Sequence, residues 1–257
     1  GSMANPRWTY DRKEAKRSLG IVGVDEAGRG CLAGPVVAGA VVLPAEFFLK
    51  ASNRKASSEM NDSKQFVEER REELYAVILD LAEGGELFWA SGEASIEEIE
   101  TENIVGATCL AMKRAMDKVS AKSKGLWSPE PKSEEDLFST TSSSKDDKKW
   151  VVRVDGRSMK RLPYEHQGLV KGDTISLAIA MGSLIAKVTR DRIMRKFAEE
   201  FPAYDFASNK GYGSPNHLKA LKESGVTRLH RPRFLRNLLP GSEQPKRDDP
   251  QSQLSFE

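Results

Sequence analysis

The chain alternates between short apolar runs, which predict buried strands, and longer segments whose apolar residues recur at helical spacing. A first strand is expected from Ile21 to Val24, and a β-branched run from Pro35 to Leu43 suits a second strand paired with it. The runs from Leu87 to Ala90 and from Trp150 to Val154 predict two more strands. Together with the helical segments between them, these strands favour an α/β fold.

Four helices are expected, at residues 67–82, 95–116, 175–201 and 215–223. Ser95 and Glu98 fit a capping box at the start of the second helix. The third begins as a nearly all-apolar run, so we expect it to be buried before its charged end emerges at the surface. The segment at 53–64 is polar and predicts a loop.

The composition excludes several classes of protein. The chain has 257 residues, which suits one large domain or a domain with an appendage. Its 40 Lys and Arg residues balance 38 acids, so any surface that binds a polyanion must be local. Two cysteines without metal-binding spacing indicate a reducing compartment. No apolar stretch is long enough to span a bilayer and no signal peptide precedes the first strand, so a soluble, cytoplasmic protein is expected.

Two adjacent carboxylates, Asp25 and Glu26, end the first predicted strand and precede a glycine-rich turn, Gly28-Arg29-Gly30. Such neighbours repel each other unless a divalent cation or a shared proton offsets the charge, and the turn lets backbone atoms approach a sugar-phosphate. A dinucleotide site is disfavoured, because the glycine spacing departs from GxGxxG and the acids stand where a pyrophosphate needs positive potential. On this stretch alone, a plain turn with solvated acids stays open.

Two further aspartates stand at comparable places. Asp155 follows the strand that begins at Trp150, so it should reach the same sheet edge as Asp25 if the two strands are neighbours. Asp173 precedes the buried helix. By itself it suits a helix N-cap better than a metal ligand, although the two roles are compatible.

A local basic region follows the third helix. Tyr212 lies between two glycines, with Lys210 before it and five basic residues after it: Arg228, His230, Arg231, Arg233 and Arg236. This pattern predicts a stacking and phosphate-contact platform, unless Tyr212 simply packs on the core. His166, His217 and His230 lack metal-ligand spacing and are expected to be structural.

Seven motifs, in one order, resemble bacterial ribonuclease HII, the type 2 ribonuclease H. They span about Leu19 to Leu239 and read VDEAGRGCLAGPVVAGAVVL, NDSK, IEEIETENI, VDG, KGDTISLAIAMGSLIAKVTRD, KGYGSPNH and LHRPRF. One departure from the family pattern is Gln65-Phe66 after the NDSK motif. The sibling ribonuclease HIII fits less well, because no extra domain precedes the first strand.

The resemblance implies a ribonuclease H-like fold, with a mixed central sheet flanked by helices and a small helical C-terminal appendage. The expected organisation is an N-terminal extension with a tag remnant at 1–18, a catalytic domain at 19–200 with a flexible insertion at 119–149, the appendage at 201–239 and a disordered tail at 240–257. A solvated composition rich in Ser, Lys and acids supports the insertion.

The resemblance also implies a four-carboxylate site for two Mg²⁺ or Mn²⁺ ions, formed by Asp25, Glu26, Asp155 and Asp173. Substrate contacts are expected from a further set, namely Gly28, Arg29, Gly30, Lys64 and Tyr212. The implied activity is endonucleolytic cleavage of the RNA strand of RNA/DNA hybrids and incision 5′ of single ribonucleotides in duplex DNA.

Two other interpretations concern binding. A non-catalytic protein that binds RNA/DNA hybrids on the same fold is the alternative to an enzyme. The end of the tail, Gln253-Leu254-Ser255-Phe256, resembles short motifs that dock replication proteins on the sliding clamp. A monomer is expected.

Overall fold

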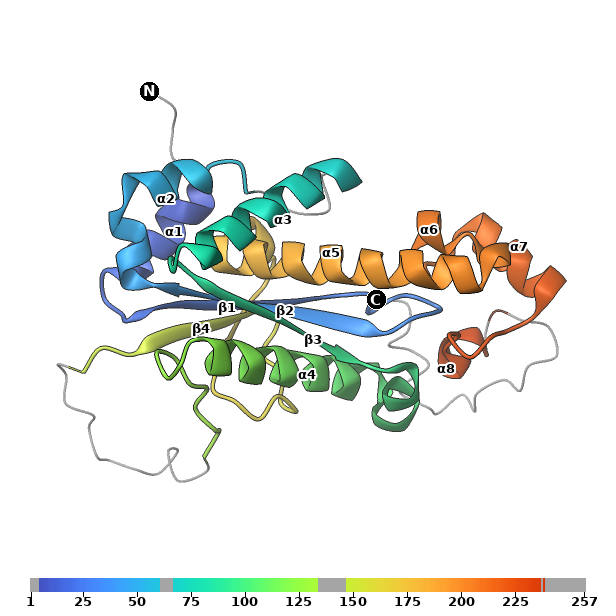
Figure 1. Cartoon of the computed structure of the whole chain (residues 1–257). Helices are drawn as coiled ribbons and strands as arrows, with labels where there is room; N and C mark the ends of the chain where they lie inside the picture. Colours follow the sequence, from blue (N-terminus) through green and yellow to red (C-terminus); the bar gives the residue numbers. More distant parts are fainter. Residues whose placement is uncertain (1–4, 61–66, 134–146, 237, 239–257) are drawn as a thin grey trace.

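A five-stranded sheet lies at the centre of the protein, in the order β3-β2-β1-β4-β5 (Figure 1). The structure is a computed structural model, and it describes residues 5–60, 67–133, 147–236 and 238. The strands are β1 (Gly20–Ala27), β2 (Val36–Pro44), β3 (Phe88–Ala94), β4 (Trp150–Asp155) and β5 (Gln167–Leu169). The first three pair in antiparallel fashion, whereas β4 runs parallel to both β1 and β5. The expected mixed sheet and the predicted pairing of the first two strands are thus confirmed.

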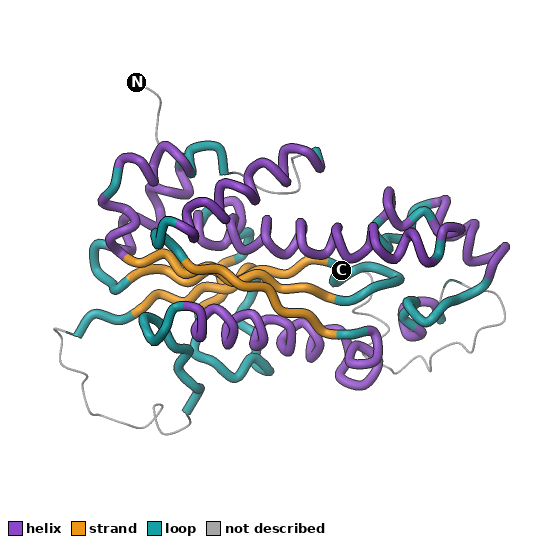
Figure 2. Tube along the Cα trace, viewed as in Figure 1, coloured by secondary structure: helices purple, strands orange, loops and turns teal. Residues whose placement is uncertain are grey.

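Helices cover both faces of the sheet and give three layers (Figure 2). One face carries the long α5 (Leu177–Glu200) together with α1 (Pro6–Ala15), α2 (Ala51–Ala56) and α3 (Glu68–Glu83). The opposite face carries α4 (Ile96–Lys122). Short helices follow the end of α5, namely η5 (Pro202–Tyr204), α6 (Phe206–Asn209), α7 (Pro215–Ser224) and α8 (Pro232–Leu235). Elsewhere in the described part of the chain lie the 3-10 turns η1 (Ala45–Leu49) and η4 (Gly172–Thr174).

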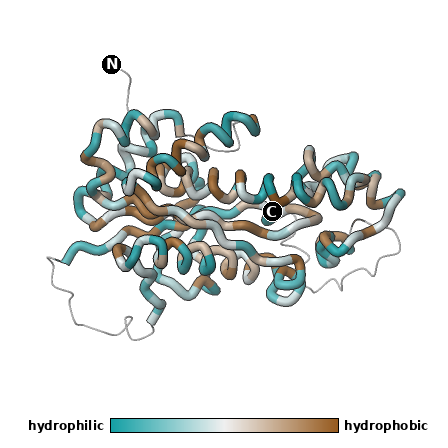
Figure 3. The backbone as a smooth tube through the Cα atoms, viewed as in Figure 1, coloured by the Kyte–Doolittle hydropathy of each residue, from teal (hydrophilic) through white to brown (hydrophobic). Residues whose placement is uncertain are grey.

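Alternation along the strands divides the core between the two faces. Ile21 of β1 packs in a cluster with Leu177 and Met181 of α5, whereas its neighbour Val22 packs in the cluster that contains Met112 of α4. Successive side chains of a strand point to opposite faces, so an apolar run such as β1 can serve both layers. The hydropathy colouring shows the central strands as largely apolar, with hydrophilic residues on the outer sides of the helices (Figure 3).

Two glycines allow α5 to lie directly on the sheet. A Cβ atom at Gly23 would come 2.2 Å from the carbonyl carbon of Ala178, and one at Gly39 would come 2.2 Å from the carbonyl oxygen of Gly182. Any larger residue would push the helix away. This close approach brings the start of α5 beside the end of β1, where the acidic residues lie.

The predicted helix boundaries hold for most segments. α3 and the capping box of Ser95 and Glu98 are as expected, and α7 begins at Pro215 and ends before Gly225. The segment expected as a loop contains α2, and the one expected as an N-terminal extension contains α1, whose Trp8 is buried.

The expected start of the insertion at residue 119 is wrong. α4 continues to Lys122, and Trp127 is 2% exposed, with its N–H donating to Ser123 Oγ. Residues 119–133 therefore pack with the domain, and the remainder of that segment at 134–146 lies outside the described residues. Within the described ranges, no helix combines the length and apolar character needed to cross a membrane.

Candidate active site

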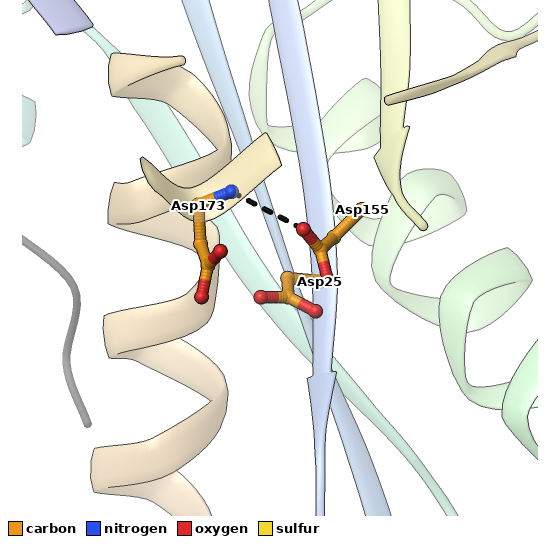
Figure 4. Close-up of side chains that lie close together, drawn as sticks. All are labelled: Asp25, Asp155 and Asp173. Atoms are coloured by element: carbon orange, nitrogen blue, oxygen red, sulfur yellow. Dashed lines mark hydrogen bonds between the residues drawn. The ribbon is translucent and has the colours of Figure 1, made fainter. Parts of the chain in front are cut away.

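Three aspartates from separate parts of the chain converge at one edge of the sheet. Asp25 belongs to β1, Asp155 ends β4, and Asp173 lies in η4, just before α5. One carboxylate oxygen of each lies within 4.8 Å of those of the others, and Figure 4 shows the three side chains pointing toward one another. Asp25 and Asp173 are buried, and Asp155 is partly buried. The structure therefore brings together the acids expected from strand ends and from the start of the buried helix.

Parallel pairing of β1 and β4 accounts for the first two positions. Val24 is aligned with Val154, so the residues that follow them, Asp25 and Asp155, emerge together at the same edge of the sheet. The third joins through a backbone contact, because the N–H of Asp173 donates to Oδ1 of Asp155 over 3.2 Å. Sheet register and turn geometry thus set the spacing of the cluster.

Asp173 does not cap α5, contrary to the simplest interpretation of its position. The N-cap is Ser176, whose Oγ accepts from the N–H of Ile179 over 3.3 Å. The carboxylate of Asp11 in α1 also caps this helix, because it accepts from the N–H of Ala178 over 2.8 Å and from the hydroxyl of Ser176 over 3.0 Å. Capping by these two residues leaves the Asp173 carboxylate to face Asp25 and Asp155.

The helix α1 also contacts the turn that carries Asp173. Nε of Arg7 donates to the backbone carbonyl of Asp173 over 2.8 Å. Asp11 is fully buried, and this burial raises its pKa to about 7. The segment before the first strand is therefore part of the support of the site, and sequence reasoning missed it because few apolar residues stand among its charges.

The electrostatics of the cluster fit a cation. Burial raises the pKa of Asp25 well above its usual range, and the nearby charges of Glu26 and Asp155 add to this effect. A divalent cation would favour the ionised forms of all three aspartates. The ligands are hard oxygens, which suit Mg²⁺ or Mn²⁺. The residues present thus fit the metal ions that the sequence implies.

Glu26, the fourth expected acid, lies outside the cluster of three. It follows Asp25 in β1, and its carboxyl group lies close enough to Asp25 to raise the pKa of that residue. Its Oε1 lies 3.9 Å from the guanidinium of Arg29. The other oxygen, Oε2, is buried and accepts no hydrogen bond from the part of the chain that the structure describes. Such an atom is suited to a ligand that brings a positive charge.

The turn at Gly28 to Gly30 is held from behind by two buried arginines. Gly28 has φ +87°, and a Cβ atom there would lie 1.9 Å from Nε of Arg190. Arg231 donates to the carbonyl oxygens of Gly28 over 2.7 Å and of Arg29 over 3.1 Å. The Arg29 side chain itself is 40% exposed, so it can reach a ligand outside the protein.

Tyr212 presents its ring beside this turn and does not simply pack on the core. It is 44% exposed, and the ammonium of Lys187 lies 5.7 Å from the ring centroid. The carbonyl of Gly211 accepts from the N–H of Leu32 over 2.9 Å, which links the Tyr212 segment to the loop after Gly30. Desolvation and the nearby Cys31 raise the pKa of the Tyr212 hydroxyl to about 12, so it remains a neutral donor.

The basic residues near Tyr212 do not all belong to the phosphate-contact platform that their sequence pattern predicts. Lys210 and Arg231 are buried, and Arg228 pairs with Glu200 over 2.7 Å. Arg233 and Arg236 each lie 3.6 Å from Glu100. Lys210 and Arg231 therefore serve structural contacts, whereas Arg228 is exposed and Arg236 is partly exposed within surface ion pairs. No sequence signal distinguishes a buried arginine from a phosphate ligand. Lys64 and the tail motif at 253–256 lie outside the described residues.

The histidines were expected to be structural, and each contacts other protein groups. Nε2 of His166 accepts from the N–H of Met159 over 3.0 Å. His217 and His230 contact each other, although their sequence spacing matches no metal site.

Comparisons with known proteins identify the family and agree with the fold. Residues 22–237 match the family model described as Ribonuclease HII. Ribonuclease HII of Fusobacterium nucleatum is 38% identical over 244 residues, which cover 94% of this chain and 96% of the relative. Ribonuclease HII of Caldanaerobacter subterraneus is 38% identical over 233 residues, which cover 90% and 81%.

A solved structure shares the fold. In the complex of PCNA with RNase HII from Archaeoglobus fulgidus, the matched chain has a TM-score of 0.56 and 24% identity, and the match covers 82% of this chain and 93% of that one. The matched fold, the family match over most of the sequence and the converging aspartates point the same way. The chain belongs to the ribonuclease HII family, whose members are metal-dependent endoribonucleases that act on RNA/DNA hybrids.

Proposed function

We propose that this ribonuclease HII also incises duplex DNA on the 5′ side of a single embedded ribonucleotide, leaving a 3′-hydroxyl and a 5′-phosphate. The observation that carries the proposal is the convergence of Asp25, Asp155 and Asp173 from three separate elements within 4.8 Å. Burying such acids together is costly without cations, and metal-assisted displacement at phosphorus uses this kind of acidic site.

The proposed cofactor is a pair of Mg²⁺ or Mn²⁺ ions. Asp25 would be the shared ligand, and Glu26, Asp155 and Asp173 would complete the two sets of ligands. When bound, the ions supply an activated water and stabilise charge on the leaving 3′ oxygen. The protein's own part is to hold the carboxylates in place, and the hydrogen bond from Asp173 to Asp155 supports that role.

Selectivity for RNA would come from the 2′-hydroxyl, the group that distinguishes it from DNA. We assign its recognition to backbone groups of Gly28 to Gly30 and to the hydroxyl of Tyr212, with the Tyr212 ring stacking on the following sugar. The half-exposed ring and the neutral hydroxyl suit this role. Arg29 and Lys64 would contact phosphates.

A clamp interaction is a separate proposal. The tail motif Gln253-Leu254-Ser255-Phe256 would dock on the bacterial sliding clamp, and the complex of the archaeal RNase HII with PCNA supports a search for such a partner. Clamp should be recovered with the full chain but not with a chain ending at residue 252. Equal recovery with both chains would refute the role of the motif.

A nicking assay tests the proposed activity. The substrate is a duplex with one ribonucleotide, and the controls are the same duplex in all-DNA form and a reaction with chelator in place of Mg²⁺. We expect metal-dependent incision on the 5′ side of the ribonucleotide, with ends that a DNA polymerase extends directly. Binding of the substrate without incision would instead favour a hybrid-binding protein.

A further inference from the structure

Two buried histidines of the C-terminal helices form a chain of hydrogen bonds that ends at Tyr212. Nε2 of His217 lies 2.9 Å from Nε2 of His230. At one end, Nδ1 of His217 lies 2.8 Å from the backbone carbonyl oxygen of Tyr212. At the other end, Nδ1 of His230 accepts from the backbone N–H of Thr227 over 3.0 Å. Both imidazoles are at most 3% exposed.

The direction of every hydrogen bond in this chain follows from one fixed donor. A backbone N–H can only donate, so the N–H of Thr227 requires an unprotonated Nδ1 on His230. The neutral His230 ring then carries its proton on Nε2 and donates it to Nε2 of His217. With that nitrogen acting as acceptor, His217 must carry its proton on Nδ1, which therefore donates to the carbonyl of Tyr212.

Both rings stay neutral in this arrangement. Protonating His217 would place two N–H groups against each other at the Nε2 contact. Protonating His230 would place an N–H against the N–H of Thr227, and the Thr227 hydroxyl, 3.0 Å from Nδ1, would have to accept it. Burial lowers the pKa of His217, and burial together with the neighbouring His217 ring lowers that of His230 to about 4. This chain of hydrogen bonds from Thr227 through His230 and His217 to Tyr212, called the relay below, therefore keeps the same donors and acceptors throughout the neutral pH range.

The same segment also holds the glycine-rich turn. Arg231 follows His230 directly and is 1% exposed. Its guanidinium donates to Gly28 and Arg29 as described above, and its backbone N–H donates to the carbonyl of Leu32 over 2.8 Å. One dipeptide, His230-Arg231, thus connects to Tyr212 on one side and to the Gly28 turn on the other.

We propose that His217, His230 and Arg231 are positioning residues that hold Tyr212 and the Gly28–Gly30 turn in one register, and thereby set selectivity for a ribonucleotide junction. The inference rests on the proposed roles of Tyr212 and the turn. Misplacing a group that recognises the 2′-hydroxyl should slow cleavage most on a lone ribonucleotide, because a single 2′-hydroxyl must be recognised there. A continuous hybrid offers many equivalent positions.

Two substitutions of His217 separate the relay from general packing. In His217→Asn the side-chain amide can replace the Nδ1 donor to Tyr212, whereas in His217→Gln it reaches toward His230 and abandons the Tyr212 carbonyl. The measured quantity is the ratio of kcat/KM on a lone-ribonucleotide duplex to that on a continuous hybrid. The matched control, Tyr204→Phe, removes the hydrogen bond from the Tyr204 hydroxyl to the carbonyl of Gly225 nearby and leaves the relay intact.

We expect His217→Gln to lower the ratio roughly tenfold, within the range that misplacement of a binding group costs. His217→Asn keeps the contact with Tyr212 but loses the acceptor for His230, so it should lower the ratio less than His217→Gln does. Tyr204→Phe should retain the wild-type ratio. In a Tyr212→Ala background, His217→Gln should lower the ratio no further, because the two residues act in series.

Three outcomes would overturn the proposal. If Tyr212→Ala lowers the ratio but His217→Gln does not, the relay is refuted while the role of Tyr212 stands. If Tyr212→Ala leaves the ratio unchanged, the role of Tyr212 is refuted, and the relay has no specificity to set.

Side-chain ¹⁵N NMR of the wild-type protein tests the relay even if a variant fails to fold. His217 must be protonated at Nδ1 and His230 at Nε2, and the opposite tautomers would contradict the inferred polarity.

Discussion

The backbone N–H of Asp173 donates a hydrogen bond to Oδ1 of Asp155 over 3.2 Å, and so joins the turn before α5 to the end of β4. One oxygen of Asp155 is thereby oriented by the protein itself. The carboxylate cluster depends on this contact and on the register of β1 with β4. Catalytic groups held by such rigid elements need little reorganisation during the reaction.

Substitutions of Asp155 separate charge from orientation. In Asp155→Asn, the amide oxygen can still accept from Asp173, so the fold should be kept while the charge is lost. We expect cleavage to fall by about a thousandfold, on the scale of losing a principal catalytic group, with substrate binding largely intact. Asp155→Ala should also lower the melting temperature, because the N–H of Asp173 loses its acceptor. Turnover by Asp155→Asn close to wild type would reject the metal role.

The contact between α1 and α5 should affect both stability and metal requirement. Asp11→Ala removes the acceptor for the N–H of Ala178, so the free energy of unfolding should fall by about 1–2 kcal/mol. Because η4 precedes α5, the change should also raise the Mg²⁺ concentration for half-maximal cleavage. Asp11→Asn keeps an acceptor and serves as the control. If Asp11→Ala matches Asp11→Asn in both denaturant unfolding and Mg²⁺ titration, α1 does not support the site.

The histidine pair should make stability fall in acid. The pKa of His230 is about 4 in the folded protein, against an ordinary 6.5, so the unfolded chain binds the proton more readily between these values. The free energy of unfolding should therefore be fully retained above pH 6.5 and decrease toward pH 4, by about 3 kcal/mol from this group. Urea unfolding at a series of pH values measures the decrease. It should be smaller in His230→Asn, and an equal decrease in both proteins would contradict the assignment.

Removing the aromatic ring at position 212 should affect the two kinds of substrate unequally. Tyr212→Ala should slow cleavage at a lone ribonucleotide more than cleavage of a continuous RNA/DNA hybrid. The reason is that the ring is proposed to stack at the junction. Initial rates on both substrates with the same enzyme preparation provide the measurement. An equal loss on both would remove the junction role of Tyr212.

The parts of the site that the sequence predicts are those determined by local pattern. Asp25 and Asp155 end apolar runs, and the edge of a sheet is where such residues meet. Asp173 precedes a buried helix, so its neighbourhood was predictable, although its expected role as a cap belongs to Ser176 and Asp11. Local pattern does not reveal which acid faces the cluster.

The supporting residues were not predictable, because their partners are backbone atoms far along the chain. Arg190 donates to the carbonyls of Ala33 and Pro35, and Arg231 to those of Gly28 and Gly34. Any residue type supplies a carbonyl oxygen, so such pairing leaves no residue-specific trace in the sequence. The same arginine looks like a phosphate ligand until the fold shows that it is buried.

Removing the charge of Asp25 most directly tests whether the clustered carboxylates perform the cleavage. The measurement compares Asp25→Asn with the wild type, as the rate of Mg²⁺-dependent nicking of a duplex with one ribonucleotide, alongside the affinity for the same duplex. We expect the wild type to nick on the 5′ side of the ribonucleotide, and Asp25→Asn to bind it with similar affinity while nicking at least about a thousandfold more slowly. Nicking by Asp25→Asn at the wild-type rate would contradict the central claim that the clustered carboxylates perform the chemistry.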